Sequence, residues 1–176
     1  SFCTLLALAF GKIDLQTVPK PSPPRGMDVF KIVLIGDSDV GKTNIMRRYT
    51  DNEFSHEFPA TTGVDFRSAL IKVGAREVRV QIWDTSGTRA FRAVAHAFYR
   101  AANAAIIVYD ITVQYSFDSV GFWLQELREH TQGTVPELFL LGSKSDLHHK
   151  REVAREVAER FARENNMLFM ETSALE

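Results

Sequence analysis

The stretch V-F-K-I-V-L-I-G-D-S-D-V-G-K-T, residues 29–43, determines how the rest of this chain is interpreted. Its first half is a short apolar run, typical of a strand that is covered on both faces. Its second half, residues 36–43, fits G-x-x-x-x-G-K-[ST], a loop whose backbone N–H groups wrap phosphate oxygens at the start of a helix. We therefore predict a phosphate loop at residues 36–43, between a strand and a helix.

The residue types in the phosphate loop indicate what it binds. Lys42 can contact the β and γ phosphates of a nucleotide, and the hydroxyl of Thr43 can ligate Mg²⁺. A plain glycine turn is the alternative, which the strand before the loop and the helix after it disfavour. The nucleotide contacts expected from this segment are Gly36, Asp37, Ser38, Asp39, Val40, Gly41, Lys42, Thr43 and Asn44.

A second segment, L-G-S-K-S-D-L at residues 141–147, indicates the base. It ends a predicted strand, where open α/β sheets place their ligands. The carboxylate of Asp146 can accept from both N1–H and the N2 amine of guanine, whereas adenine offers no such donor pair. Lys144 can lay its stem along the base and ribose. S-K-S-D alone is a common surface turn, but after a phosphate loop it predicts guanine recognition.

Two further segments follow predicted strands. In W-D-T-S-G, residues 83–87, Asp84 can hold a Mg²⁺-bound water and the backbone N–H of Gly87 can approach a γ-phosphate. An ordinary turn at a strand end is the alternative for this segment. In E-T-S-A-L, residues 171–175, the backbone can reach the edge of the base, so the expected contacts are Ser173, Ala174 and Leu175.

Strand-like and helix-like segments alternate from residue 29 onward. This alternation predicts an α/β fold with a mostly parallel sheet. One pair of segments alternates apolar and polar residues around Gly74 and is expected to form a hairpin. The six predicted strands are 29–36, 66–73, 77–83, 104–110, 138–142 and 168–171.

Two apolar stripes recur at helical spacing between these strands. Both are expected to face the core of the domain. The first consists of Phe117, Val120, Leu124 and Leu127, and the second of Val153, Val157 and Phe161.

The composition is that of a folded domain of ordinary size. The chain has 176 residues, a formal net charge of -1, 45% apolar and 24% charged residues. The near-neutral charge provides no electrostatic reason to expect a nucleic acid partner. A single cysteine, Cys3, excludes an internal disulfide, and no apolar run approaches the ~20 residues of a membrane-spanning helix.

The first 26 residues differ from the rest. Eight of the first ten are apolar, and four of the six prolines lie between positions 19 and 24. Residues 1–26 are therefore predicted to be a disordered N-terminal extension and proline-rich linker. The folded domain is expected over residues 27–176.

From Met27 to Glu176 the chain resembles the Rab-type small GTPases of the Ras superfamily. Several motifs carry the resemblance, in the family's order and spacing: G-D-S-D-V-G-K-T (36–43), T-G-V-D-F (62–66), V-Q-I-W-D-T-S-G (80–87), F-Y-R-A-A (98–102), I-V-Y-D-I-T (107–112) and S-K-S-D (143–146). The resemblance implies the P-loop NTPase small-GTPase fold, a six-stranded, mostly parallel sheet with helices on both faces. The last helix and the prenylated tail of the family are expected to be missing here.

The resemblance also implies a function and partners. It implies a switch in vesicle trafficking that binds GTP or GDP with Mg²⁺, hydrolyses GTP slowly, and meets exchange factors, GTPase-activating proteins and effectors. The expected location is cytoplasmic, on the cytosolic face of endomembranes if the complete protein has a prenylated tail. Thr61 would join Mg²⁺ and the γ-phosphate, and Phe54 would pack on the guanine edge. An exposed triad for effectors is implied at Phe66, Trp83 and Phe98, with core packing as the alternative.

The chain departs from the family pattern at several site positions. Thr88 stands where the family has the Gln that orients the attacking water, and Arg89 replaces the next residue, usually Glu. Asp39 lies where relatives carry an uncharged residue, Ser143 replaces Asn, and Leu175 replaces Lys. Residues expected at the hydrolysis site are Lys42, Thr61, Gly87 and Thr88, and the Mg²⁺ ligands are Thr43, Thr61 and Asp84.

Two hypotheses follow from the matches and the departures. In the first, the protein is a GTPase with weak intrinsic activity. In the second, it is a Rab-like module that holds nucleotide poorly or hydrolyses it negligibly and acts through constant partner contacts. A P-loop kinase or ATPase is a third possibility, but it leaves S-K-S-D unexplained.

Overall fold

The computed structural model describes residues 28–73, 76–88, 91–131 and 136–176. The predicted extension and linker, the Gly74 turn and Arg89 lie outside these residues. Among the described helices, none combines the length and the apolar character needed to cross a membrane.

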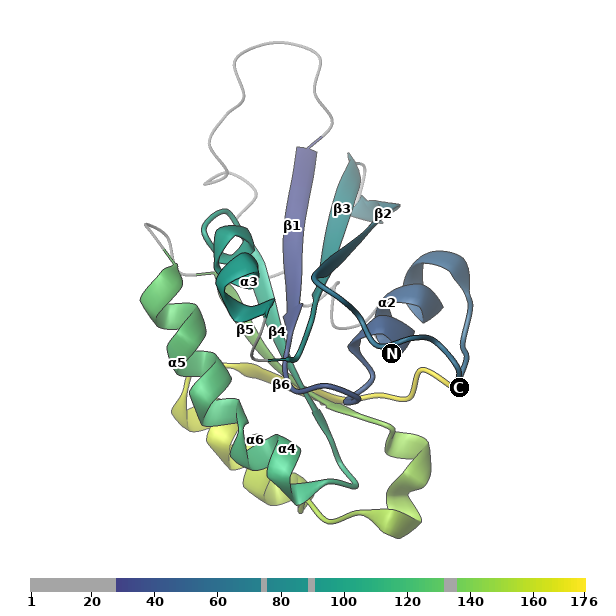
Figure 1. The fold of residues 1–176 in the computed structure, drawn as a ribbon, viewed down its shortest axis with the longest axis vertical. Helices are drawn as coiled ribbons and strands as arrows, with labels where there is room; N and C mark the ends of the chain where they lie inside the picture. The colour runs from purple at the N-terminus through teal and green to yellow at the C-terminus, as the bar shows by residue number, and fades with distance from the viewer. Residues whose placement is uncertain (1–27, 74–75, 89–90, 132–135) are drawn as a thin grey trace.

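The described strands form one six-stranded sheet in the order β2-β3-β1-β4-β5-β6. β2 and β3 pair antiparallel, and every other neighbouring pair is parallel. This confirms the predicted mostly parallel α/β sheet and the hairpin within it (Figure 1). The strands are β1 (Asp28–Ile35), β2 (Val64–Val73), β3 (Arg76–Thr85), β4 (Ala104–Asp110), β5 (Glu137–Ser143) and β6 (Leu168–Glu171).

Helices cover both faces of the sheet, as predicted (Figure 1). On one face α2 buries Ile45 and Met46 against β1, β3 and β4. On the other face α3, α5 and α6 pack over a second apolar layer that includes Tyr99, Trp123 and Ala158. The helices are α2 (Lys42–Asp51), α3 (Arg92–Tyr99), α4 (Gln114–Asp118), α5 (Val120–His130) and α6 (Arg155–Glu164), with a 3₁₀ helix η2 (Ser145–Lys150).

The structure changes two expectations about the apolar helical stripes. The first stripe is divided between α4 and α5, which meet at Ser119, although its members do face the core. The prediction that Val157 faces the core is wrong, because this side chain is 40% exposed. In α6 the buried face instead carries Ala158 and Ala162, four residues apart, whose small side chains suit a helix packed on β5 and β6.

This topology brings the predicted site segments to one edge of the sheet. The phosphate loop follows β1, the W-D-T-S-G segment ends β3, and S-K-S-D and E-T-S-A-L follow β5 and β6. Because parallel strands run in the same direction, their carboxyl ends meet at the same edge. Segments more than 100 residues apart in sequence therefore lie side by side.

Candidate functional site

The phosphate loop connects β1 to α2, and Lys42 is the first residue of that helix. The Lys42 side chain is buried, and its Nζ donates to the carbonyl oxygens of Gly36 (3.0 Å) and Asp37 (2.7 Å). Burial lowers the pKa of the Lys42 ammonium, while the negative charges of Asp84, Asp37 and Asp39 oppose this. The ammonium group of Lys42 is thus held by two backbone carbonyls of the phosphate loop itself.

Three predicted metal ligands from three different segments meet at one oxygen atom. Asp84 Oδ2, at the end of β3, accepts from Thr43 Oγ1 at 2.5 Å and from Thr61 Oγ1 at 3.1 Å. The two threonine hydroxyls are 2.9 Å apart. Burial raises the pKa of the Asp84 carboxyl, and the Lys42 ammonium opposes this.

The second carboxylate oxygen of Asp84 lacks a hydrogen-bond partner among the described residues. This atom, Asp84 Oδ1, is buried. A buried carboxylate oxygen without a partner is costly, and hard oxygen donors are the ligands that Mg²⁺ prefers. The oxygen atoms of Asp84, Thr43 and Thr61 therefore fit a Mg²⁺ ion.

The other end of the site is built where β5 and β6 end. Asp146 Oδ1 accepts a hydrogen bond from Ser173 Oγ at 2.6 Å, and Ser173 Oγ in turn accepts from the N–H of Leu175 at 3.0 Å. The N–H of Ser145 donates to the carbonyl of Thr172 at 3.2 Å. These bonds join the two segments and orient the Asp146 carboxylate.

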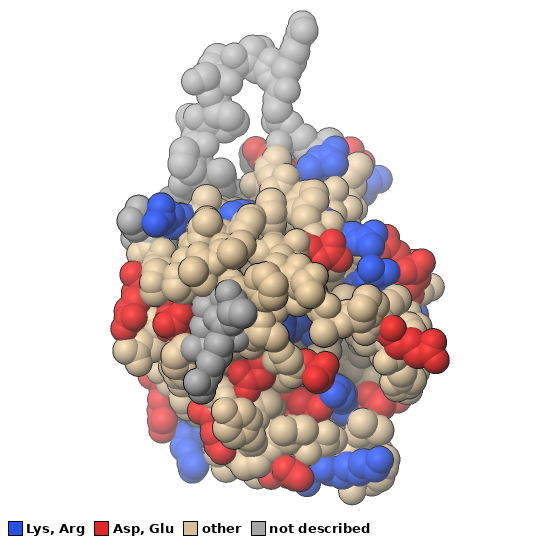
Figure 2. All heavy atoms as spheres, viewed as in Figure 1, with Lys and Arg blue, Asp and Glu red and all other residues tan. Residues whose placement is uncertain are grey.

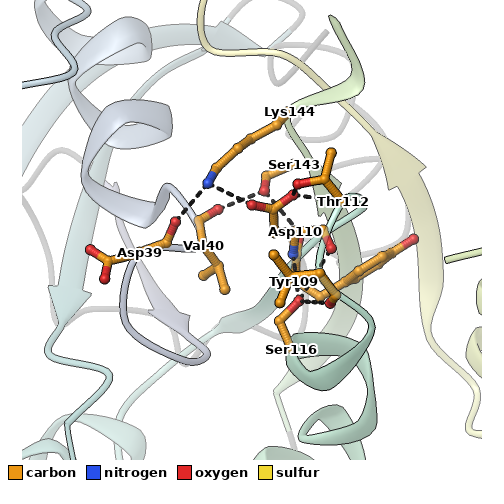
Figure 3. A network of polar contacts seen from close by, with 9 residues as sticks. Asp39, Val40, Tyr109, Asp110, Thr112, Ser116, Ser143 and Lys144 are labelled. Atoms are coloured by element: carbon orange, nitrogen blue, oxygen red, sulfur yellow. Dashed lines mark hydrogen bonds and ion pairs between the residues drawn. The ribbon is translucent and has the colours of Figure 1, made fainter. Parts of the chain in front are cut away.

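Ser143 ties the phosphate loop to the sheet. Its buried hydroxyl lies 2.6 Å from the carbonyl oxygen of Val40 and 2.9 Å from that of Tyr109. Figure 3 draws both contacts as dashed lines. One hydroxyl carries one proton, so it can donate fully to only one of these carbonyls at a time. Ser143 therefore reaches the phosphate loop despite being shorter than the Asn it replaces.

Lys144 adds a second tie to the phosphate loop. Its Nζ contacts the carbonyl of Asp39 at 2.9 Å and Asp110 Oδ2 at 2.5 Å (Figure 3). The Asp110 carboxylate is held from its other oxygen by the N–H and hydroxyl of Thr112. The aliphatic part of the Lys144 side chain thus extends from the end of β5 across the phosphate loop. It lines the cavity that a base and ribose would occupy.

A cavity of about 480 Å³ runs between these two ends. Most of the sequence-predicted nucleotide residues line it: Ser38, Asp39, Gly41, Lys42, Thr43, Asn44, Phe54, Thr61, Gly87, Ser143, Lys144, Asp146, Ala174 and Leu175. Those that do not line it are Gly36, Asp37, Val40, Asp84, Thr88 and Ser173.

Sequence reasoning missed one wall of this cavity. Most of the 55–60 segment also lines it (Ser55, His56, Phe58, Pro59 and Ala60), as do Ile45 and Leu147. Asn44 holds the 55–60 segment in place, because its side-chain amide donates to the Ser55 carbonyl (3.0 Å) and accepts from the Ser55 N–H (3.2 Å). The only sequence signal was the neighbouring Phe54, whose ring makes an edge contact with that of His56.

The loop after β3 is packed directly on the phosphate loop. A Cβ atom on Gly87 would lie 2.2 Å from the backbone nitrogen of Ser38, so no side chain fits there. The next residue, Thr88, is exposed, and its Oγ1 lies 3.1 Å from the hydroxyl of Ser86. Thr88 thus pairs with its own loop and stands outside the cavity.

The predicted aromatic triad is continuous. The Phe66 and Trp83 ring centroids are 4.7 Å apart, as are those of Trp83 and Phe98, and Lys31 Nζ lies 4.9 Å from the Trp83 ring. Phe66 is 42% exposed, whereas Trp83 and Phe98 are half-buried against the core. Phe66 is therefore exposed, as an effector triad requires. Trp83 and Phe98 are partly packed in the core, as the alternative requires.

Charged side chains of both signs are mixed on the face of the molecule that Figure 2 shows. On the face seen in Figure 2, Lys and Arg lie among Asp and Glu around a broad area of uncharged residues. That face presents no field of one sign to a polyanionic partner.

Comparison with known proteins identifies the class. The family model described as "Ras family" matches residues 31–176. The GTP-binding protein ypt3 of Schizosaccharomyces pombe is 51% identical over 148 residues, which cover 84% of this chain and 69% of the relative. Ras-related protein Rab-25 of Canis lupus familiaris (47%) and Ras-related protein RABA1g of Arabidopsis thaliana (49%) match over the same share of this chain and 69% and 68% of their own lengths.

The chain therefore belongs to the Ras family, as a small GTPase of the Rab type. This confirms the resemblance found in the motifs. Members of the family are GTPases that bind GTP and GDP, and their partners include regulators and effectors.

Asp39 allows a first prediction. Its backbone is left-handed (φ 63°), its side chain is exposed, and it lines the cavity beside the phosphate loop. Two charges about 5 Å apart at an effective dielectric of about 20 repel by about 3 kcal/mol, and we expect exposure to reduce this to roughly a tenfold effect on release. Asp39→Asn, which tolerates the same backbone, should therefore slow release of a fluorescent GDP analogue at low salt.

Varying the salt concentration distinguishes an electrostatic effect of Asp39 on nucleotide release from a steric one. The difference between the Asp39→Asn variant and the unmodified protein should shrink at high ionic strength, because screening weakens the repulsion. Asp39→Glu keeps the charge and should not slow release. Equal release rates for Asp39→Asn and the unmodified protein at low salt would show that the carboxylate is electrostatically neutral toward the nucleotide.

Proposed function

We propose that this protein is a guanine-nucleotide switch of the Rab type that acts in vesicle trafficking and holds GTP or GDP together with Mg²⁺. The observation that carries the proposal is the convergence of Thr43, Thr61 and Asp84 on one point beside Lys42. The three ligand candidates come from three separate segments, and a buried orphan oxygen lies among them. An ordinary turn would not need this arrangement.

The residues take the following roles in the proposed site. Lys42 would leave its two loop carbonyls to contact phosphate oxygens, and Asp146, oriented by Ser173, would select guanine. Thr43, Thr61 and Asp84 would hold Mg²⁺, which supplies charge neutralisation on the phosphates when bound. Phe54 and the 55–60 segment would close the cavity wall.

The proposed partners would meet the switch segments. Exchange factors, GTPase-activating proteins and effectors would contact the loops that carry Thr61 and Gly87, because these loops respond to the γ-phosphate in such switches. Phe66, Trp83 and Phe98 lie beside these loops and would supply an aromatic contact surface. We propose that the protein works at the cytosolic face of endomembranes when a lipidated tail is present.

One observation favours the second candidate function, a nucleotide-binding module with negligible hydrolysis. Thr88 is paired with Ser86 rather than turned into the cavity. Its single short hydroxyl cannot contact both a water and a phosphate oxygen. Nucleotide binding would then persist without turnover, and partners would meet one constant state.

Binding of a fluorescent GDP analogue to the full chain tests the proposal. GTP should displace the analogue and ATP should not, and removal of Mg²⁺ should speed release. Thr43→Ala should abolish most of the Mg²⁺ effect, because loss of one charge-assisted contact costs about 1.5–3 kcal/mol, or roughly 10- to 100-fold. Thr50→Ala serves as the control, because it removes a hydroxyl from the same helix whose bonds among the described residues go to Met46 and Asp51, outside the cavity.

Two results of this experiment would contradict the proposal. Equal competition by ATP and GTP would exclude guanine selection by Asp146. Release that is insensitive to Mg²⁺ in the unmodified protein would exclude the metal assignment for Thr43, Thr61 and Asp84.

A further inference from the structure

Three potential metal ligands lie together between α3 and α5, outside the nucleotide cavity. His96 comes from α3, and Glu126 and His130 come from α5. One ligand atom from each lies within 4.8 Å of the others, and all three side chains are half-buried. No other such group of three is found among the residues that the structure describes.

The two helices present these side chains to one another. Glu126 and His130 are four residues apart and so share one face of α5. His96 Nε2 lies 2.8 Å from Glu126 Oε2, with side-chain exposures of 22% and 19%. The His96 and His130 rings are stacked, with centroids 3.4 Å apart and an interplanar angle of 18°.

The tautomer of His130 follows from its hydrogen bond. Its Nδ1 lies 2.9 Å from the carbonyl oxygen of Glu126. A carbonyl only accepts, so Nδ1 carries the proton and the neutral ring has its lone pair on Nε2. A backbone carbonyl that fixes the ring of a histidine in this way is the usual support of a metal-ligating histidine.

We infer that His96, Glu126 and His130 form a binding site for a divalent transition-metal ion, Zn²⁺ foremost, with water completing the coordination. Two imidazoles and one carboxylate are a ligand set that zinc uses, whereas Mg²⁺ prefers oxygen alone. With bonds near 2.0–2.1 Å, tetrahedral ligand atoms lie roughly 3.3 Å apart. His96 Nε2 and Glu126 Oε2 lie 2.8 Å apart, and the ligand atoms of all three residues lie within 4.8 Å of one another, so the three side chains can share one ion once the two stacked rings turn toward it.

A bound ion would connect α3 and α5 close to the loop that carries Thr88 and to the aromatic triad. α3 begins four residues after Thr88 and carries Phe98 of the aromatic triad. A metal held between α3 and α5 would restrain this segment whatever nucleotide is bound. The site goes beyond the proposed nucleotide function and does not depend on it.

Zinc titration of the full chain tests the site. All chains carry Cys3→Ser, which removes the lone thiol, and Zn²⁺ is titrated against a chromophoric chelator in excess Mg²⁺. We expect one Zn²⁺ per chain, and at least about tenfold weaker binding in His96→Ala, since even loss of a supporting group costs 10- to 100-fold. A His148→Ala/His149→Ala double variant removes two exposed histidines of η2 and should bind as the Cys3→Ser chain does.

Two further measurements report on the site itself. Zn²⁺ should raise the unfolding temperature of the Cys3→Ser chain and not that of His96→Ala, and Co²⁺ should produce the visible absorption of a tetrahedral site. If circular dichroism shows that His96→Ala is unfolded, Glu126→Gln takes its place in the same comparison. Absence of bound Zn²⁺ in the Cys3→Ser chain, equal affinity in the folded ligand variant, or loss in the η2 double variant would overturn the inference.

Discussion

Asp146→Asn is expected to lower the affinity for GTP by roughly 10²- to 10⁴-fold, because the variant loses two charge-assisted hydrogen bonds of about 1.5–3 kcal/mol each. The carboxylate lines the cavity and is oriented by Ser173 at 2.6 Å. An amide in its place would point an N–H₂ group at the donors of guanine. Xanthine carries an oxygen where guanine has its amine, so the variant should gain affinity for xanthine nucleotides.

Competition between GTP, XTP and ATP for a fluorescent nucleotide measures this change. Asp118→Asn makes the same chemical substitution at an exposed carboxylate on α4 and should leave GTP affinity unchanged. If GTP and XTP affinities are unaltered in Asp146→Asn, a group other than Asp146 reads the base.

Thr88→Gln is expected to raise single-turnover GTP hydrolysis on the order of 10²-fold. A residue that orients the attacking water contributes about this much to phosphoryl transfer. Thr88 has a single hydroxyl, which in the structure lies 3.1 Å from Ser86 Oγ. A Gln at this exposed position has both a donor and an acceptor and the length to extend past Ser86 toward the cavity.

The matched control is Thr88→Ala, which removes the hydroxyl without adding an amide. Its hydrolysis rate should equal that of the unmodified protein, because Thr88 contributes no contact in the cavity. An unchanged rate in Thr88→Gln would mean that another group positions the water, or that the site is inactive for other reasons.

Several parts of the site could be predicted because their chemistry is local. The phosphate loop is a contiguous pattern between an apolar strand and a helix, so it can be recognised without knowing which distant residues pack against it. The same holds for S-K-S-D after β5 and for Asp84 at the end of β3. Parallel strands then bring these segments to one edge of the sheet, and that step needs only the predicted alternation of strands and helices.

Other parts depend on contacts between segments that no pattern links. The 55–60 segment has no motif, and it becomes a cavity wall because Asn44 holds Ser55 through two hydrogen bonds. The exposure of Val157 depends on the register of α6 against the sheet, which places Ala158 and Ala162 inward. A helical stripe read from sequence alone leaves that rotation undetermined by about one residue.

The sequence by itself determined the class of fold, the family and the segments that form the nucleotide cavity, because each of these rests on contiguous residues or on the order of strands and helices. The tertiary structure alone decided which side chains meet. It placed Thr43 and Thr61 on one oxygen of Asp84, turned Thr88 toward Ser86, and brought His96 of α3 against Glu126 and His130 of α5. Such side-chain contacts depend on the rotation of each helix about its axis and on the conformation of each loop. Both are determined by the packing of the whole domain.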